Sequence, residues 1–418
     1  MQTQLAPSLK DSPLGREAES IVQKCVHCGF CLATCPTYTL VGDELDSPRG
    51  RIYLMKQMLE GAPVTEKTRH HLDRCLTCRA CETTCPSGVQ YGRLVDAGRV
   101  IAEEKAPRTW AARAMRWGMR QVLARPSLFG LATMSGRLAK PFLPATLAKK
   151  LPGKRMAGPW PASAHARTMI VLQGCVQPVL APDINAAFAR VMDALGVSVR
   201  VAASAGCCGA LDHHLNAHDA SRQRARDNID AWWSLVEAGA EAIVITASGC
   251  GTQVRDYAHL LQDDALYASR AAKVAALARD PAEVLQAERD RLTERLSAAP
   301  ASGLPRVAFH SPCSLQHGLK IRGVVEALLK LAGYSLTSVP DSHLCCGSAG
   351  TYSLLQAELS QSLLERKVAA LQSDAPALIA TANIGCLTHI ESGADRPVRH
   401  WIELIDARIA TMREPSRI

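Results

Sequence analysis

Two long stretches of the chain alternate short apolar runs with patterns typical of amphipathic helices. Helical patterns at 182–195 and 216–237 separate the apolar runs of the first stretch. The apolar runs that predict strands are 168–173, 197–202 and 242–246 in the first stretch, and 306–310, 335–339 and 378–381 in the second. Strands that alternate with helices predict βαβ units and parallel sheets. We therefore expect two α/β modules in the carboxyl-terminal part of the chain.

The amino-terminal part has a different, mainly helical pattern. The predicted helices cover 16–24, 49–60 and 93–105. Ser47 and Pro48 form a strong helix start, because serine caps free N–H groups and proline suits the first helical position. Residues 1–106 are therefore expected to form one small helical domain.

The net charge of +9 originates in one segment. Residues 105–155 hold twelve Lys and Arg and no Asp or Glu, whereas the remainder of the chain is slightly acidic. On a helical projection Arg113, Arg116 and Arg120 share a narrow stripe, which predicts an amphipathic basic helix. Such a helix could bind anionic lipid, dock on an acidic partner subunit or face solvent. Residues 151–166 have the composition of a linker.

Eight of the sixteen cysteines form two copies of one spacing, Cys-x2-Cys-x2-Cys-x3-Cys-Pro. Three cysteines two residues apart let one short loop hold three corners of an iron–sulfur cube, and in two-cluster ferredoxins the fourth cysteine ligates the other cluster. The spacing therefore predicts two [4Fe–4S] clusters with exchanged fourth ligands. We expect the first cluster on Cys25, Cys28, Cys31 and Cys85, and the second on Cys75, Cys78, Cys81 and Cys35.

Two other interpretations of these eight cysteines are weaker. Zinc sites usually combine two cysteines with a distant second pair, whereas each run here already supplies four thiols. Disulfides at this density suit a small secreted domain, and the amino terminus lacks a secretory signal pattern. We expect a cytoplasmic protein, because a reducing compartment keeps thiols available as ligands.

The other eight cysteines recur at matched positions in the two α/β modules. Each module has one cysteine, a Cys-Cys-Gly pair that begins 32 residues later, and a last cysteine. Each cysteine follows a predicted strand, where parallel sheets place ligand sites. Three interpretations stay open: a further iron–sulfur centre, a thiol/disulfide centre, or small buried hydrophobes. The two sets are Cys175, Cys207, Cys208 and Cys250, and Cys313, Cys345, Cys346 and Cys386.

Other sequence features limit the ligands and reactions that can be expected of this chain. His389, three residues after Cys386, is the best histidine candidate for an additional ligand. The sequence has no Gly-x-Gly-x-x-Gly, phosphate loop or nucleophile elbow, so we expect no flavin on this chain and no catalytic residue in it. An aromatic content of 4% argues against nucleic-acid binding by base stacking. No uncharged apolar run approaches the roughly 18–20 residues of a spanning helix.

Several segments around and beyond the cysteines carry a family resemblance. They are 25–38 (CVHCGFCLATCPTY), 47–52 (SPRGRI), 73–78 (DRCLTC), 228–233 (NIDAWW), 341–351 (DSHLCCGSAGT) and 400–403 (HWIE). With these segments the chain resembles the iron–sulfur subunits of membrane-linked dehydrogenases and heterodisulfide reductases, most closely the glycolate oxidase family. The resemblance spans nearly the whole chain.

The resemblance implies a hetero-oligomeric complex. Flavin-containing subunits of that complex would oxidise glycolate to glyoxylate, with D-lactate as a second candidate substrate. This chain would relay the electrons to quinone or another membrane acceptor, from a peripheral position on the inner face of the cytoplasmic membrane. Alternatives are the equivalent subunit of a lactate or glycerol 3-phosphate dehydrogenase complex, a disulfide reductase that uses the Cys-Cys pairs, and a zinc-binding scaffold.

The chain departs from the heterodisulfide reductase relatives at the end of each repeat. Those relatives end with Cys-x2-Cys, whereas Cys250 is followed by Gly-Thr-Gln253 and Cys386 by Leu-Thr-His389. The fifth thiol is missing from both modules, so the unusual cluster of those relatives is not carried over.

The expected fold is α+β and multidomain. A helical, ferredoxin-like domain with two clusters precedes two homologous α/β modules with parallel sheets. The expected segments are the helical domain 1–106, the basic helical segment and linker 107–166, the first cysteine-rich module 167–300 and the second 301–418.

Overall fold

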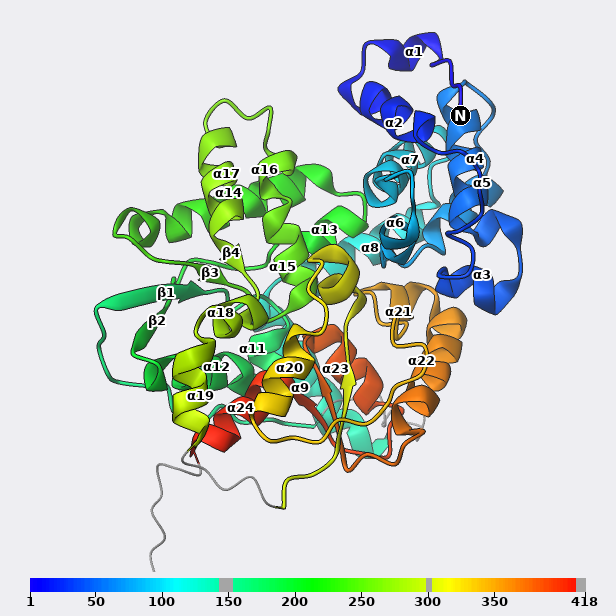
Figure 1. The fold of residues 1–418 in the computed structure, drawn as a ribbon. Helices are drawn as coiled ribbons and strands as arrows, with labels where there is room; N and C mark the ends of the chain where they lie inside the picture. Colours follow the sequence, from blue (N-terminus) through cyan, green and yellow to red (C-terminus); the bar gives the residue numbers. More distant parts are fainter. Residues whose placement is uncertain (143–152, 298–302, 411–418) are drawn as a thin grey trace, which may run out of the picture.

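The computed structural model describes residues 1–142, 153–297 and 303–410. The predicted linker residues 151–152, the predicted module boundary at 300/301 and residues 411–418 lie outside the described residues. A helical amino-terminal domain lies beside a larger body that contains two parallel sheets (Figure 1). The expected α+β multidomain fold is confirmed.

The amino-terminal domain consists of short helices joined by the two cysteine loops. They are α1 (Pro7–Lys10), α2 (Pro13–Gln23), α3 (Pro36–Val41), the 3-10 helix η1 (Glu44–Asp46), α4 (Pro48–Leu59), α5 (Glu66–Asp73), α6 (Ala80–Thr84) and α7 (Tyr91–Lys105). The predicted helix start is confirmed, since the Ser47 hydroxyl accepts a hydrogen bond from the Gly50 N–H at 2.9 Å. Helices α2, α4 and α7 pack together around a buried core that includes Ile21, Met55 and Leu94.

The basic segment forms two helices, α8 (Trp110–Leu123) and α9 (Pro126–Ala139), followed by the short helix η2 (Lys140–Phe142). Two of the three arginines in the predicted stripe lie near acidic residues of the same chain. Arg120 lies 2.7 Å from the buried Asp212 carboxylate, and Arg116 lies 3.7 Å from Asp73. Only Arg113 of the three is exposed, because the other two pair with acids that a helical projection cannot reveal.

The first module has a four-stranded parallel sheet in the order β2-β1-β3-β4. Its strands are β1 (Arg167–Val171), β2 (Val197–Val201), β3 (Ile243–Val244) and β4 (Ala278–Arg279). Its helices are α11 (Gln177–Leu180), α12 (Asp183–Ala194), α13 (Ala210–His214), α14 (His218–Glu237), α15 (Ser248–Arg255), α16 (Tyr257–Leu260), α17 (Ala268–Leu277), α18 (Pro281–Ala287) and α19 (Arg289–Ser297). The three predicted strands are present, and β4 is an addition.

The second module has a three-stranded parallel sheet in the order β5-β6-β7. Its strands are β5 (Val307–His310), β6 (Leu378–Thr381) and β7 (Val398–His400). Its helices are η3 (Ser314–Gly318, a π-helix), α20 (Val324–Leu331), α21 (Tyr352–Leu355), α22 (Ala357–Gln372), α23 (Ile384–Glu391) and α24 (Trp401–Ala410). The strand predicted at 335–339 is wrong, since that segment makes only one bridge, between Leu336 and Val307.

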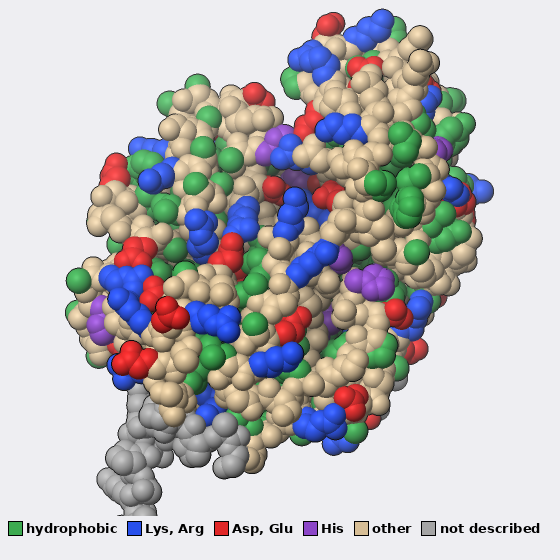
Figure 2. All heavy atoms as spheres, viewed as in Figure 1, with side chains coloured by type: hydrophobic (Ala, Val, Ile, Leu, Met, Phe, Trp, Pro, Cys, Tyr) green, Lys and Arg blue, Asp and Glu red, His purple; other side chains and the backbone are tan. Residues whose placement is uncertain are grey.

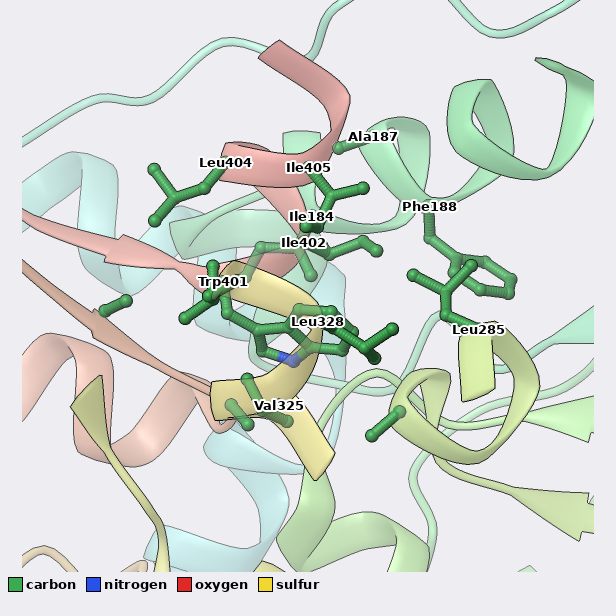
Figure 3. Close-up of a cluster of buried hydrophobic side chains, with 14 of the residues drawn as sticks. Ile184, Ala187, Phe188, Leu285, Val325, Leu328, Trp401, Ile402, Leu404 and Ile405 are labelled. Carbon is green, nitrogen blue, oxygen red and sulfur yellow. The ribbon is translucent and has the colours of Figure 1, made fainter. Parts of the chain in front are cut away.

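The two modules share one hydrophobic core. Helix α12 of the first module packs against α24 of the second, and α18 packs against α20. Figure 3 shows Phe188 and Leu285 from the first module beside Leu328 and Trp401 from the second. Phe188, Leu328 and Trp401 are completely buried. Because this apolar surface is common to both modules, they pack together as one unit that carries two cysteine sets.

The amino-terminal domain is fastened to both modules by polar contacts. Arg79 pairs with Asp256 of the first module at 3.0 Å. Tyr352 of the second module donates a hydrogen bond to the Arg74 carbonyl at 3.1 Å. The Asp96 carboxylate and the His213 ring nitrogen Nε2 are 3.1 Å apart. Burial opposes the charge on His213, but Asp96 overcomes it and raises the pKa of His213.

Replacing His213 by Gln is expected to destabilise the chain by roughly 1–3 kcal/mol at pH 6, because a largely buried, charge-assisted hydrogen bond is lost. Because the pKa of His213 is higher in the folded chain than in the unfolded chain, its pairing with Asp96 stabilises the fold fully below about pH 6.5. This stabilisation is lost as the pH rises through the folded-state pKa of His213. Urea unfolding at pH 6 and pH 9 checks this, and the difference from the wild type should shrink at the higher pH. An equal difference at both pH values contradicts the ion pair.

The described residues include no helix with both the length and the apolar content that crossing a bilayer requires.

Candidate metal centres

Both cysteine runs of the amino-terminal domain adopt the same loop conformation. His27 and Gly29 in the first run have φ of 57° and 86°, and Thr77 and Arg79 in the second run have φ of 54° and 59°. These paired left-handed residues let three cysteines of each loop turn toward one point. The identical spacing of the two runs is therefore accompanied by the same backbone conformation in both loops.

Each loop borders a small cavity that the other run completes. One cavity is lined by the set Cys25, Cys28, Cys31 and Cys85, and the other by the set Cys35, Cys75, Cys78 and Cys81; Cys81 also lines the first. Four thiols around a void suit a tetrahedral arrangement of sulfur ligands. The sets coincide with the exchanged sets expected from the spacing, and the assignment of ligands stays a prediction.

Burial and neighbouring thiols disfavour the thiolate form of cysteines around these cavities. Burial, and after it the neighbouring thiols, raise the pKa values of Cys25, Cys31 and Cys81, that of Cys31 to about 11. A bound metal centre favours the thiolate form over the thiol, because it binds the thiolate sulfur directly. The donor set and its surroundings therefore fit an iron–sulfur group.

A buried ionic network supports the second cavity. The Asp46 carboxylate is fully buried and lies 3.2 Å from Arg51, 2.6 Å from Arg74 and 3.1 Å from His71. The Asp46 carbonyl accepts a hydrogen bond from Thr37 at 2.9 Å, and it lies 3.8 Å from the sulfur of Cys35. Asp46 therefore joins helix α4, helix α5 and the cysteine loop at one point.

The second cavity lies against the second module. Cys78 and Leu76 pack in one apolar cluster with Cys313 and Cys345. The proximity is close enough that Cys345 raises the pKa of Cys78, after the larger effect of burial. The thiols of the amino-terminal domain are thus continuous with those of the second module.

In the second module four cysteines and one histidine converge. Cys313 and Cys345 have their sulfur atoms 3.8 Å apart. The ligand atoms of His310, Cys346 and Cys386 all lie within 4.8 Å of one another, and all three residues are buried. Burial lowers the pKa of His310 to about 3, so its ring is neutral.

His310, and not His389, is the histidine of this set. His389 lies on α23 and shares a hydrogen bond with the Ser360 hydroxyl at 3.2 Å. His310 ends strand β5 and lies opposite Thr381 in the sheet register. The expectation for His389 rested on its nearness to Cys386 in sequence, whereas the end of a predicted strand three residues before Cys313 was the better signal.

The first module gathers its four cysteines in the same way. The neighbouring thiols of Cys175 and Cys208 lower the pKa of Cys207, and those of Cys207 and Cys250 raise the pKa of Cys208. Asn228 donates to the Cys207 carbonyl at 2.9 Å, which fixes the paired-cysteine loop.

The glycine after each cysteine pair has a positive φ, 88° at Gly209 and 90° at Gly347. A Cβ atom at Gly347 would lie 2.6 Å from the Ser360 carbonyl oxygen. Glycine is therefore required there for both conformation and space.

A cavity of about 1330 Å³ separates the amino-terminal domain from the two modules. Cys78, Cys250 and Cys386 all line it, so thiols of three sets border one space. Figure 2 shows the surface hollowed between the amino-terminal domain and the first module. Glu17 and His259, which are 3.5 Å apart, line the cavity from these two parts of the chain.

Comparisons with known proteins agree with this organisation. Residues 21–89 match the family described as a 4Fe-4S dicluster domain, and residues 169–255 and 307–391 each match a cysteine-rich domain. The chain is 54% identical to the glycolate oxidase iron–sulfur subunit of Escherichia coli K12, over 97% of this chain and 98% of that protein. It is 30% identical to a probable glycolate oxidase iron–sulfur subunit of Bacillus subtilis, over 91% of each chain. Lactate utilization protein A of Bacillus subtilis is 26% identical over 56% of this chain and 97% of its own length.

Proposed function

Because the chain belongs to the family of glycolate oxidase iron–sulfur subunits, we propose that it relays electrons from flavin-containing partner subunits to a membrane acceptor. The partners oxidise glycolate to glyoxylate, and D-lactate is a second substrate of the same class. The flavin is assigned to the partners, because this sequence has no dinucleotide-binding motif. Quinone is the proposed acceptor.

Two [4Fe–4S] clusters are proposed on the exchanged cysteine sets of the amino-terminal domain. Bound there, they supply one-electron transfer at potentials set by their protein surroundings. The two modules are proposed to hold further iron on their own cysteine sets. The chain itself contributes the thiol ligands, the burial that excludes water, and the fixed distances between sets.

The order of the thiol sets is the observation that carries this proposal. Cys28, in the first set, is exposed at the surface. Cys81 lines both of the small cavities, and Cys78 packs with Cys313 and Cys345 of the second module. Cys386 and Cys250 then border the central cavity. The thiols thus form a continuous series from the protein surface to an internal space.

Electrons are proposed to enter at the exposed end of this series. Val26 and Phe30 lie in the same loop as Cys28, and Tyr53 packs against His27 of that loop; the three are 67%, 64% and 46% exposed. Large exposed apolar side chains next to a redox ligand are suited to docking a partner that carries the donor.

Replacing Phe30 by Ser is expected to weaken binding of the flavin-containing subunits at least tenfold, because an apolar interface anchor is lost. Affinity of the purified chain for those subunits measures the effect. Leu266→Ser is the matched control, because Leu266 is 82% exposed on the first module. Equal weakening by both changes, or by neither, contradicts this docking surface.

Attachment to the membrane is proposed through helices α8 and α9. Trp110 and Trp117 lie on one face of α8 and are 82% and 61% exposed. On α9, Leu131 and Leu138 are 56% and 73% exposed. Apolar stripes of this kind in a segment without acidic residues are typical of helices that lie in a lipid interface. The opposite side of α9, including Phe129, lines the central cavity, so a lipid-soluble acceptor would have a short path to the thiols.

The combined change Trp110→Ser and Trp117→Ser is expected to lower binding to vesicles of anionic phospholipid at least tenfold, since two interfacial aromatic anchors are removed. Vesicle flotation measures bound and free protein. Arg113→Glu should have a smaller effect that disappears in high salt. Unchanged flotation of the tryptophan variant would leave α8 as a candidate for a protein contact instead.

Anaerobic purification of the whole complex, followed by addition of substrates, tests the proposed reaction. Glycolate should bleach the visible absorption of the iron–sulfur groups, and quinone should restore it. The lactate alternative is less favoured, because the lactate relative matches only 56% of this chain. A complex that responds to lactate or glycerol 3-phosphate but not to glycolate would overturn the proposal.

A further inference from the structure

His310 is a buried histidine with one ring nitrogen that has no hydrogen-bond partner among the residues that the structure describes. The side chain is 2% exposed. Its Nδ1 atom shares a hydrogen bond of 2.9 Å with the Thr381 hydroxyl on the neighbouring strand, whereas no group of the described part of the chain bonds the buried Nε2. Leaving a buried polar nitrogen unsatisfied costs about 1–3 kcal/mol, which calls for an explanation.

The surroundings of His310 are a set of potential ligands. Cys346 and Cys386 lie with it in the group whose ligand atoms are all within 4.8 Å of one another. Cys345, the neighbour of Cys346, has its sulfur 3.8 Å from that of Cys313. The module therefore presents four thiols and one imidazole at the carboxyl ends of two adjacent parallel strands, where α/β sheets hold ligands.

We propose that His310 is a ligand of an iron–sulfur centre in the second module, together with Cys313, Cys345, Cys346 and Cys386. The inference rests on the proposal that this module holds iron. Thr381 acts as the orienting partner, since a hydrogen bond to one ring nitrogen directs the other toward a metal. Imidazole in place of thiolate is known chemistry for such centres and raises their reduction potential.

The first module provides an internal comparison. The residue three positions before its first cysteine, Cys175, is Leu172, whereas the residue three before Cys313 is His310. Leu172 is 3% exposed and lies in an apolar cluster with Cys208 and Ile245. The first module therefore has four thiols and no imidazole at this place, and the two cysteine sets are chemically different.

Pulsed EPR of the full chain, purified anaerobically and partly reduced, tests the ligand directly. The second-module centre should show a nitrogen hyperfine coupling that changes when the protein is labelled with [15N]histidine. His310→Ala should remove that coupling, and His389→Ala, a change in the same module, should leave it intact. A His310→Cys variant should keep the iron, lose the coupling and have a lower reduction potential.

The outcomes separate this inference from the proposed function. Signals of the amino-terminal clusters in the same sample report on electron transfer by the dicluster domain, whatever happens in the second module. A wild-type chain with those signals but without a histidine coupling overturns the role of His310 alone. Stoichiometric zinc in the second module overturns it too, as does a coupling that survives in His310→Ala. If His310→Ala does not fold, the His310→Cys variant decides the question, because a histidine coupling that survives in it overturns the role of His310.

Discussion

The combined change Cys25→Ala and Cys85→Ala should leave about half of the dicluster iron in place, whereas Cys25→Ala with Cys35→Ala should remove nearly all of it. Exchanged ligation puts Cys25 and Cys85 on one cluster, and puts Cys25 and Cys35 on different clusters. If each run held its own cluster, the two results would be reversed. Both variants lose the same number of thiols from the same domain, so general damage cannot mimic the difference.

Iron and sulfide analysis with low-temperature EPR on anaerobically purified chains measures this effect. The mirror pair provides a second comparison, because Cys75→Ala with Cys35→Ala should also spare half of the iron and Cys75→Ala with Cys85→Ala should spare little. Cys250→Ala, in the first module, is the control that should leave the dicluster iron unchanged. Alanine is used because a serine oxygen can replace a thiolate at such centres. Equal iron in the two matched variants contradicts the exchanged assignment.

Much of the cysteine chemistry could be predicted from sequence because it is local. A loop with three cysteines two residues apart has few ways to direct its side chains, and the same left-handed residues recur at His27 and Thr77. The internal repeat likewise revealed two modules, because matched positions imply matched places at the ends of strands. Helix starts such as Ser47–Pro48 follow the same logic, since a cap involves only neighbouring residues.

The errors concern contacts between distant parts of the chain. The stripe of Arg113, Arg116 and Arg120 was expected to bind lipid, dock on an acidic partner subunit or face solvent, but Asp212 of this chain pairs with Arg120. The two-residue strand β4 and the three-residue strand β7 were not predicted, because so short a run carries no periodicity. The run at 335–339 has the apolar pattern of a strand, but only Leu336 forms a bridge.

His310 shows a related limit of sequence analysis. Spacing to a cysteine suggested His389, yet helix α23 directs that ring to Ser360. Strand register, which requires knowing that β5 lies beside β6, brings His310 opposite Thr381 and close to Cys346. A ligand contributed by a strand end is thus found by topology, whereas one contributed by a loop is found by spacing.

Asp46→Ala is expected to destabilise the amino-terminal domain by about 3–5 kcal/mol, because it leaves Arg51 as a buried charge without its partner. The side chains of Arg51 and Asp46 are 1% and 0% exposed. Burial alone would raise the pKa of Asp46, but His71, Arg51 and Arg74 hold it below its usual value. Because the pKa of Asp46 is lower in the folded chain than in the unfolded chain, the ionised carboxylate stabilises the fold above about pH 4. This stabilisation is lost as the pH falls through the folded-state pKa of Asp46.

Urea unfolding of the full chain, followed by loss of the visible absorption of the dicluster, measures the change. With a typical dependence of about 1–3 kcal/mol per molar urea, the midpoint should fall by about 1 M or more. Glu44→Ala is the matched control, because the Glu44 carboxylate also pairs with an arginine, Arg49 at 2.7 Å, but is 43% exposed. An exposed pair of this kind contributes about 0–1 kcal/mol. Equal midpoints for the two variants would mean that the buried network does not hold the cysteine loop, and the support assigned to Cys35 would have to come from elsewhere in the domain.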